Sequence, residues 1–123
     1  MLSLTKGGIT MATVKSFTSL EQSRKLAKIL PLETADMYWW FSGKRYYIEA
    51  MDDGDFNKEE GHVRAWSLAA LLGVLPNGIV MNKDSQNGMY HFSSKYIGTS
   101  VTADNPVDAC YEMIIKLNEL NLL

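Results

Sequence analysis

Oxygen-bearing side chains alternate along residues 53–58, as they do at the start of a calcium-binding loop. Such a loop has glycine at its sixth position and a bidentate acid at its twelfth. These two positions hold Lys58 and Arg64 in this chain. We therefore expect an exposed acidic loop over residues 52–61, with no metal site.

Cys110 is the one cysteine of the chain, and its thiol could act as a nucleophile if His62 or His91 served as its base. No flanking motif supports that pairing, and Cys110 falls on the apolar stripe of a predicted helix, where cysteine usually packs. Two histidines and one cysteine are too few and too scattered for a structural zinc site. Glycine-rich phosphate loops, H-E-x-x-H and G-x-S-x-G are absent as well. We expect a protein that is not an enzyme and that uses no cofactor.

Residues 37–50 predict a β-hairpin with aromatic side chains on both faces. A three-residue turn would mix polar and apolar side chains on each face, whereas an even-numbered turn separates them. A two-residue turn at Gly43-Lys44 makes one face wholly apolar by pairing Phe41 with Tyr46, Trp39 with Ile48, and Met37 with Ala50. We expect that face to be core and the opposite face to be outer.

The outer face of the hairpin mixes large rings with charge, which is the composition of a protein-binding surface. Binding energy is expected to concentrate in its rings, with acids of the following loop as a polar rim. The alternative is that a loop or the N-terminal arm covers these rings. The candidate partner-binding residues are Tyr38, Trp40, Arg45, Tyr47, Glu49, Asp52, Asp53 and Asp55.

A second function class is a small-ligand or nucleotide-sequestering domain, with a pocket beside a helix predicted at residues 66–75. Arg64, Trp66 and His91 are the expected lining of that pocket. The helix has Ser67 as its only polar side chain. A helix that is apolar all round must lie between a sheet and another helix or take part in an interface, so a homodimer is an open alternative.

Helix signals mark both ends of the chain. Residues 18–21 have the spacing of a capping box between Thr18 and Glu21, which predicts a helix that ends near Pro31. Asn105 as N-cap, with Pro106 at the first helical position, begins the last helix.

Strand signals lie between these helices. Residues 79–81 and 89–92 flank the turn signal Asn87-Gly88, and residues 96–102 predict a further strand. The expected fold class is α+β, with a small antiparallel sheet of four to five strands and about three helices mainly on one face. The expected order is α-β-β-α-β-β-(β)-α.

Composition restricts the setting of the protein. An apolar fraction of 46% and a charged fraction of 21% over 123 residues are typical of one globular domain, expected over residues 12–123 after a flexible arm at residues 1–11. No apolar run approaches the length of a membrane span or signal peptide, so we expect a soluble cytoplasmic protein without a membrane partner. Direct nucleic-acid binding is not expected, because the net charge is −2 and there is no basic cluster.

Three segments together resemble one family. They are SLEQSRKLAKILPLETADM at residues 19–37, AWSLAALLGVLP at 65–76 and ADNPVDACYEMIIKLNELNLL at 103–123. The segments are similar to small, mostly uncharacterised proteins that phages and mobile elements of gut bacteria encode. This resemblance implies a bacterial host cell and a counter-defence role, such as that of an anti-CRISPR protein, through contact with a protein partner. It implies no catalytic residues, and it does not extend to the aromatic hairpin or the acidic loop.

Overall fold

The computed structural model describes residues 2–3, 11–12, 15–51, 61–94 and 98–123. Its helices are α1 (Leu20–Leu26), the short 3-10 helix η1 (Leu32–Thr34), α2 (Leu68–Val74) and α3 (Pro106–Glu119). Its strands are β1 (Leu2–Ser3), β2 (Met11–Ala12), β3 (Met37–Phe41), β4 (Tyr46–Ala50), β5 (Val63–Ala65), β6 (Ile79–Lys83), β7 (Tyr90–Ser94) and β8 (Ser100–Ala103). The α+β class is confirmed, and the order of elements agrees with the expected one except for the additional strands β1, β2 and β5.

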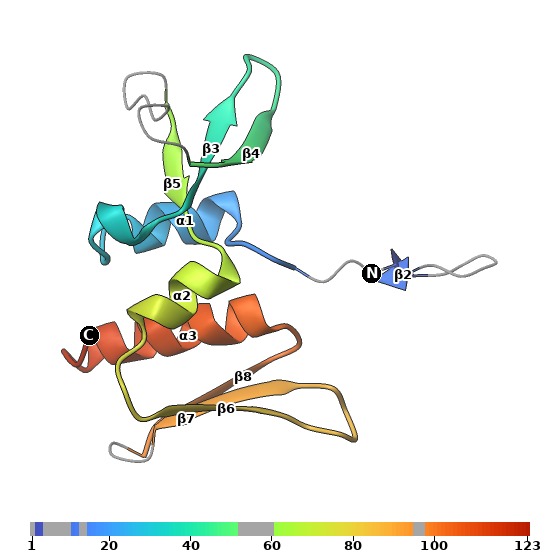
Figure 1. Cartoon of the computed structure of the whole chain (residues 1–123), viewed down its shortest axis with the longest axis vertical. Coiled ribbons are helices and arrows are strands. Elements are labelled where there is room, and N and C mark those ends of the chain that lie inside the picture. The colour runs from blue at the N-terminus through green and yellow to red at the C-terminus, as the bar shows by residue number, and fades with distance from the viewer. Residues whose placement is uncertain (1, 4–10, 13–14, 52–60, 95–97) are drawn as a thin grey trace.

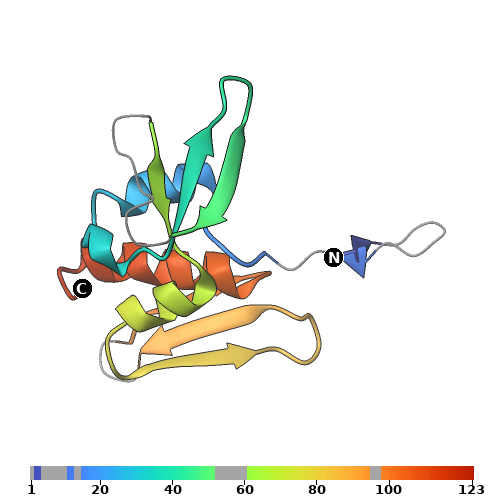
Figure 2. The same cartoon turned by 45° about the horizontal axis from the view of Figure 1, so that its top comes forward.

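Two antiparallel sheets of three strands, ordered β4-β3-β5 and β6-β7-β8, lie on opposite sides of the helices (Figures 1 and 2). The single sheet expected from the sequence is therefore divided in two. The physical reason is that α2 separates β5 from β6 along the chain. The strands before α2 and the strands after it therefore form separate sheets. The first sheet packs on α1, and the second packs on α3. Strands β1 and β2 pair only with each other in the described chain.

One hydrophobic core joins both halves of the molecule. It draws on α1, η1 and its flanking residues, the end of β5, α2, β7 and α3. Each large side chain that is fully buried there contributes about 1.5–3 kcal/mol to stability. The core residues are Leu26, Leu30, Ala35, Trp66, Leu71, Phe92, Val107, Ala109, Cys110, Met113, Ile114 and Leu117.

The N-terminus of α1 is capped one residue later than the sequence pattern predicts. Ser19 is the N-cap, its hydroxyl accepts a hydrogen bond from the Gln22 amide, and the Gln22 side chain accepts one from the Ser19 amide. Thr18 is instead fully buried, where its hydroxyl accepts a hydrogen bond from the Trp66 amide. The prediction of Thr18 and Glu21 as the capping box was wrong, because the neighbouring pair Ser19 and Gln22 has the same spacing and leaves Thr18 for the core.

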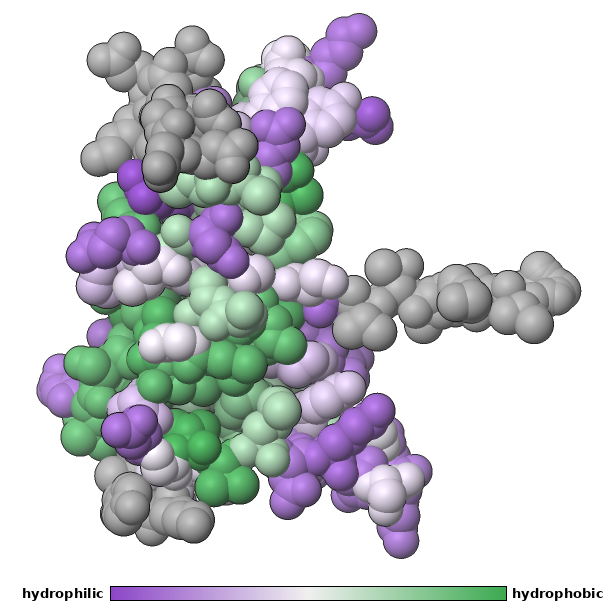
Figure 3. Space-filling view, viewed as in Figure 1, coloured by the Kyte–Doolittle hydropathy of each residue, from purple (hydrophilic) through white to green (hydrophobic). Residues whose placement is uncertain are grey.

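Helix α2 begins after Ser67, which caps it through a hydrogen bond from the Ala70 amide to the Ser67 hydroxyl. One side of α2 packs on α3 and η1. The other side is open, and Leu72 is 42% exposed. Figure 3 shows the hydrophobic side chains that gather over this part of the molecule. The apolar helix α2 is therefore not covered on all sides by the described chain. The homodimer that could cover its open side stays a prediction.

The C-terminal elements follow the sequence pattern closely. β6 and β7 form the expected hairpin, β8 adds a third strand, and α3 starts from Asn105 with Pro106 in its first turn. Within the described part of the chain, none of the helices has the length and apolar character needed to cross a membrane.

Candidate functional site

The β3–β4 turn has the geometry predicted for residues 42–45. The Ser42 amide donates a 3.0 Å hydrogen bond to the Arg45 carbonyl, and Gly43 has φ of +99°. Glycine adopts this region readily because it has no Cβ. The turn therefore joins the strands after Phe41 and before Tyr46, which confirms the predicted register of all three pairs.

From Tyr38 onward, exposure along β3 increases toward the turn instead of alternating between the two faces. Tyr38 is 6% exposed, Trp39 and Trp40 are half-buried, and Phe41 is 46% exposed. The reason is that the hairpin extends beyond the helices, as the upper part of Figure 1 shows, so both faces near the turn meet solvent. The expectation that one whole face would be core and the other outer was wrong for Phe41 and Ala50, which are exposed, and for Tyr38, which is buried.

Four rings and one guanidinium form the cluster that we call the hairpin tip. The rings of Trp40 and Tyr47 stack with centroids 5.0 Å apart, and those of Phe41 and Tyr46 lie 4.9 Å apart. The guanidinium of Arg45 lies 4.9 Å from the centroid of the Tyr47 ring, and its Nε donates a 2.8 Å hydrogen bond to the Tyr47 hydroxyl. These contacts connect the four rings and Arg45 to one another.

Helix α1 supports the hairpin tip from one side. Arg24 donates a 3.1 Å hydrogen bond from Nη2 to the Tyr46 hydroxyl, and its guanidinium lies 5.7 Å from the Tyr46 ring centroid. Trp39 lies closer to the core, where its ring meets Phe17 edge-on and its indole N–H donates to the Thr18 carbonyl. The indole N–H of Trp40 is enclosed and finds no acceptor among the described residues. Stacking is thus the interaction that positions Trp40.

Tyr38 is structural in this arrangement. Its ring stacks on His62 with centroids 5.0 Å apart, and its hydroxyl donates a 2.9 Å hydrogen bond to Glu49. Among the candidate partner-binding residues, the structure exposes Arg45, Tyr47 and Glu49. Asp52, Asp53 and Asp55 lie outside the described residues, as does the acidic loop that was expected there.

The ligand pocket expected beside Trp66 does not assemble. Trp66 is fully buried, and its indole N–H donates a 2.9 Å hydrogen bond to the Thr34 hydroxyl. His91 lies on β7 in the other sheet, where its Nδ1 is 2.8 Å from the Thr102 hydroxyl. Arg64 is the one residue of the three that lines a pocket of the first sheet.

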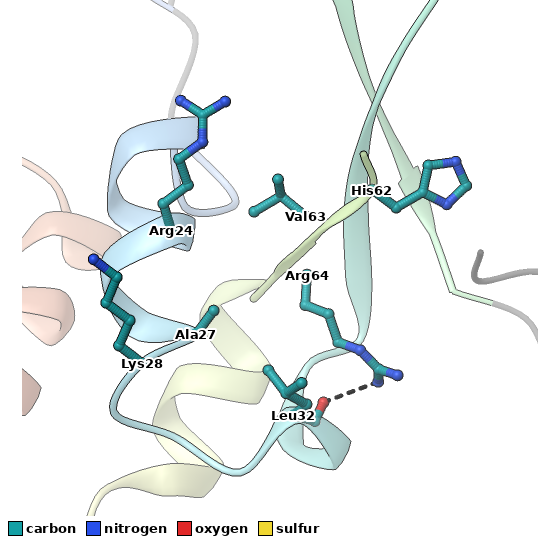
Figure 4. A pocket seen from close by; sticks show the side chains of 7 residues that line it. All are labelled: Arg24, Ala27, Lys28, Leu32, His62, Val63 and Arg64. Atoms are coloured by element: carbon teal, nitrogen blue, oxygen red, sulfur yellow. Dashed lines mark hydrogen bonds between the residues drawn. The ribbon is translucent and has the colours of Figure 1, made fainter. Parts of the chain in front are cut away.

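That pocket has a volume of about 480 Å³ and opens between α1 and β5 (Figure 4). Ala27, Leu32 and Val63 provide its apolar surface, and Figure 4 shows the Arg64 guanidinium beside the Leu32 carbonyl at 3.1 Å. The other described lining residues are Arg24, Lys28 and His62. None of the described lining residues is acidic, so the pocket combines an apolar surface with positive charge.

Cys110 is not placed for catalysis. It is fully buried on α3, and burial raises the pKa of its thiol to about 12. A thiol with such a pKa is almost entirely protonated at neutral pH and is a poor nucleophile. His91 projects from the side of β7 opposite to the buried Phe92, so the pairing of Cys110 with His91 is excluded by geometry. Within the described residues, no three His, Cys, Asp or Glu side chains gather as a metal site would require.

Sequence reasoning missed Arg24 and Lys28 as functional candidates. Arg24 lies on α1 and Lys28 follows the end of that helix; both line the pocket, and Arg24 also contacts the hairpin tip. Their spacing of one helical turn was a signal that they share a face of the predicted helix. Comparison with known proteins adds nothing further, because no family model, no curated protein and no solved structure matches this chain.

Proposed function

We propose that this chain is a small non-enzymatic binding protein that engages a protein partner through the hairpin tip. The observation that carries the proposal is the exposure of Phe41 and Tyr47, 46% and 37%, at the end of the hairpin that extends beyond the core. Neither ring belongs to the hydrophobic core, and each has apolar surface left to bury in a complex.

The composition of the tip supports this function. Trp, Tyr and Arg are the residues in which interface energy concentrates, and the tip contains all three types within two adjacent strands and the turn between them. The stacked pairs also restrict the rings before any partner arrives. Less conformational entropy is then lost on binding, which favours affinity.

Charge near the turn indicates the chemistry of the partner. Lys44 and Arg45 are exposed beside the rings, and Arg24 lies against Tyr46. The partner surface is therefore expected to have an apolar depression surrounded by carboxylates, because complementary charge speeds encounter and fixes orientation. A role as an inhibitor of a bacterial defence system stays a prediction from the family resemblance.

The test uses the double variant Phe41→Ser/Tyr47→Ser. Immobilised wild-type and variant proteins are exposed to lysates of gut bacteria, captured proteins are identified by mass spectrometry, and the best candidate is purified for calorimetry. We expect the variant to lose at least about tenfold in affinity, which corresponds to about 1.4 kcal/mol, while its melting temperature changes by only a few degrees.

The matched control is Leu72→Ser, which removes an equally exposed apolar side chain on α2. A partner that binds the wild type and the control, but not the double variant, supports the proposal. Equal binding of all three proteins would show that the partner docks elsewhere. A fall in melting temperature of the double variant by more than about ten degrees would show that these rings are structural.

A further inference from the structure

We propose that a second copy of this chain pairs with the free edge of β4, antiparallel to it and about a two-fold axis at Tyr47. The two three-stranded sheets then join into one continuous sheet, β5-β3-β4 followed by the same strands of the second copy in reverse order. This contact goes beyond the proposed function, because it needs no other protein and uses the backbone of β4. It is also separate from the open side of α2.

The edge position of β4 is the first argument. In the described chain β4 pairs only with β3, and Figures 1 and 2 show it at the outer side of the first sheet. The strand contains no proline, and its five residues pair with β3 without a bulge. An edge strand of this kind presents a row of amides and carbonyls on which another strand can pair.

Hydrogen bonds at both ends of the β3–β4 ladder show which backbone groups face outward. At one end, the Ser42 amide donates to the Arg45 carbonyl. At the other end, the Met51 amide donates to the Asp36 carbonyl. Since hydrogen-bonded and non-hydrogen-bonded pairs alternate in an antiparallel ladder, the odd-numbered residues of β4 bond to β3. The amides and carbonyls of its even-numbered residues therefore face the free edge.

Charge complementarity is the second argument, and it selects a second copy as the occupant. Antiparallel pairing about Tyr47 places Arg45 opposite Glu49 of the second copy, and the two-fold axis repeats this pair. On the other face, Tyr46 lies opposite Ile48 of the second copy. The charged pairs fall at non-hydrogen-bonded positions, where opposing side chains come closest.

Arg45 and Glu49 can form these ion pairs while they keep their present contacts. Both are exposed, and neither forms an ion pair with a described residue. They lie four residues apart, about 13 Å along the strand, which is too far for an ion pair with each other. Arg45 donates to the Tyr47 hydroxyl through Nε, which leaves its two Nη groups. Glu49 accepts from Tyr38 at one of its two carboxylate oxygens.

The edge strand β6 does not have this complementarity. It contains Lys83 and no acid, and Asp84, which directly follows it, alternates to the opposite face. No antiparallel register about a two-fold axis brings Lys83 opposite Asp84 of a second copy, because paired residues share a face. The charges therefore favour β4 over β6 as the edge for self-pairing.

Sedimentation equilibrium of the purified full chain tests for the dimer. Tyr47 also belongs to the hairpin tip, so a measurement without any other protein keeps this inference apart from the proposed function. We expect the average mass to rise from 13.8 kDa toward twice that value between about 10 μM and about 1 mM of chain, because so small an interface gives a weak dimer. The mass of one chain throughout would overturn the inference and leave the edge of β4 to a strand of another protein.

A cysteine at the two-fold axis tests the register. The two copies of residue 47 form a non-hydrogen-bonded pair with Cα atoms about 4.5 Å apart, which a disulfide can bridge. Tyr47→Cys should therefore give a disulfide-linked dimer under mild oxidation, without competition from the fully buried Cys110. Ala50→Cys is the control, since residue 50 is exposed on the same strand but lies about 20 Å from its copy in the dimer. Equal cross-linking of both variants would contradict this register.

Charge reversal tests the ion pairs. Arg45→Glu and Glu49→Arg each replace two attractions in the dimer by two repulsions, so each should weaken dimerisation at least about tenfold. The double variant Arg45→Glu/Glu49→Arg restores opposite charges and should recover dimerisation to within about threefold of the wild type. Lys83→Glu, on the edge of β6, changes the net charge as Arg45→Glu does and should leave dimerisation unchanged.

Two results of the charge series would contradict the inference. Failure of the double variant to recover the dimerisation that both single variants lose would exclude the pairing of Arg45 with Glu49. Equal losses in Arg45→Glu and Lys83→Glu would show an effect of net charge alone. Because Glu49→Arg also removes the hydrogen bond to the buried Tyr38, circular dichroism must show that the variants are folded. Where Glu49→Arg is not folded, Arg45→Glu and the cysteine variants decide.

Discussion

Asp108 shows how one carboxylate can organise three parts of the chain. Its Oδ1 accepts hydrogen bonds from Lys15 Nζ at 2.7 Å and Gln22 Nε2 at 2.8 Å, and its Oδ2 accepts one from Asn105 Nδ2 at 2.8 Å. Burial disfavours the ionised form, but these hydrogen bonds and the charge of Lys15 outweigh it, so the pKa of Asp108 is lowered from 3.8. The carboxylate thus joins the segment before α1, α1 itself and the start of α3.

This lowered pKa gives the stability of the protein a predictable dependence on pH. A carboxyl group with a lower pKa in the folded state stabilises the protein above its ordinary pKa, and that contribution is lost as the pH falls through the folded value. We expect Asp108→Asn to be less stable than the wild type at neutral pH. The difference in unfolding free energy should shrink as the pH falls below 3.8.

Denaturant titrations at a series of pH values would measure this difference. Glu112→Gln is the control, since Glu112 is exposed on the same helix. Its effect on stability should not follow the same pH course. A constant difference between wild type and Asp108→Asn from neutral pH to below 3.8 would contradict the assigned role of Asp108.

At the scale of elements, α1 depends on Gln22 more than on the neighbouring Glu21. The Gln22 side chain accepts the Ser19 amide and donates to Asp108, whereas Glu21 is exposed. The helix is only seven residues long, so it gains little from intrinsic propensity and relies on its cap and packing.

We therefore expect Gln22→Ala to reduce the unfolding free energy by about 1–2 kcal/mol, because it removes half of the capping box and the hydrogen bond to Asp108. Glu21→Ala should change it by about 0.5 kcal/mol or less, as for most surface substitutions. Urea unfolding of both variants measures the two effects. Equal losses would indicate that the cap lies where the sequence pattern first suggested, at Thr18.

The sequence predicted the structure correctly where interactions between residues close together in the chain determine it. The register of β3 and β4 follows from a two-residue turn and from polarity, and the start of α3 follows from Asn105 and Pro106, so both were predictable. Strand β5 was not predictable, because a strand of only three residues carries no alternating pattern. Tyr38 stacks on His62, which directly precedes that unpredicted strand, and this explains why the candidate site was only partly predictable.

The whole molecule has one core, although its strands form two sheets. Trp66 and Leu26 of the first half pack in the same cluster as Phe92 and Met113 of the second. Because the buried core residues of both halves belong to this one cluster among the described residues, the two halves are expected to unfold together.

Two spectroscopic probes can test this cooperativity. All three tryptophans lie between residues 39 and 66, so their fluorescence reports on the first half, whereas far-UV circular dichroism is dominated by α3, the longest helix described. The two denaturation curves should coincide. A fluorescence transition at clearly lower denaturant than the circular dichroism transition would show that the first sheet and α1 unfold independently.

The position of the β3–β4 turn beyond the core has a consequence for how this protein can evolve. Substitutions among the exposed residues of the tip disturb few contacts with the interior, so new variants at this place keep the fold intact. Natural selection can therefore remodel recognition at the turn while folding is maintained by a separate set of residues. A protein that must follow a changing target would benefit from this division between a conserved framework and an adaptable loop.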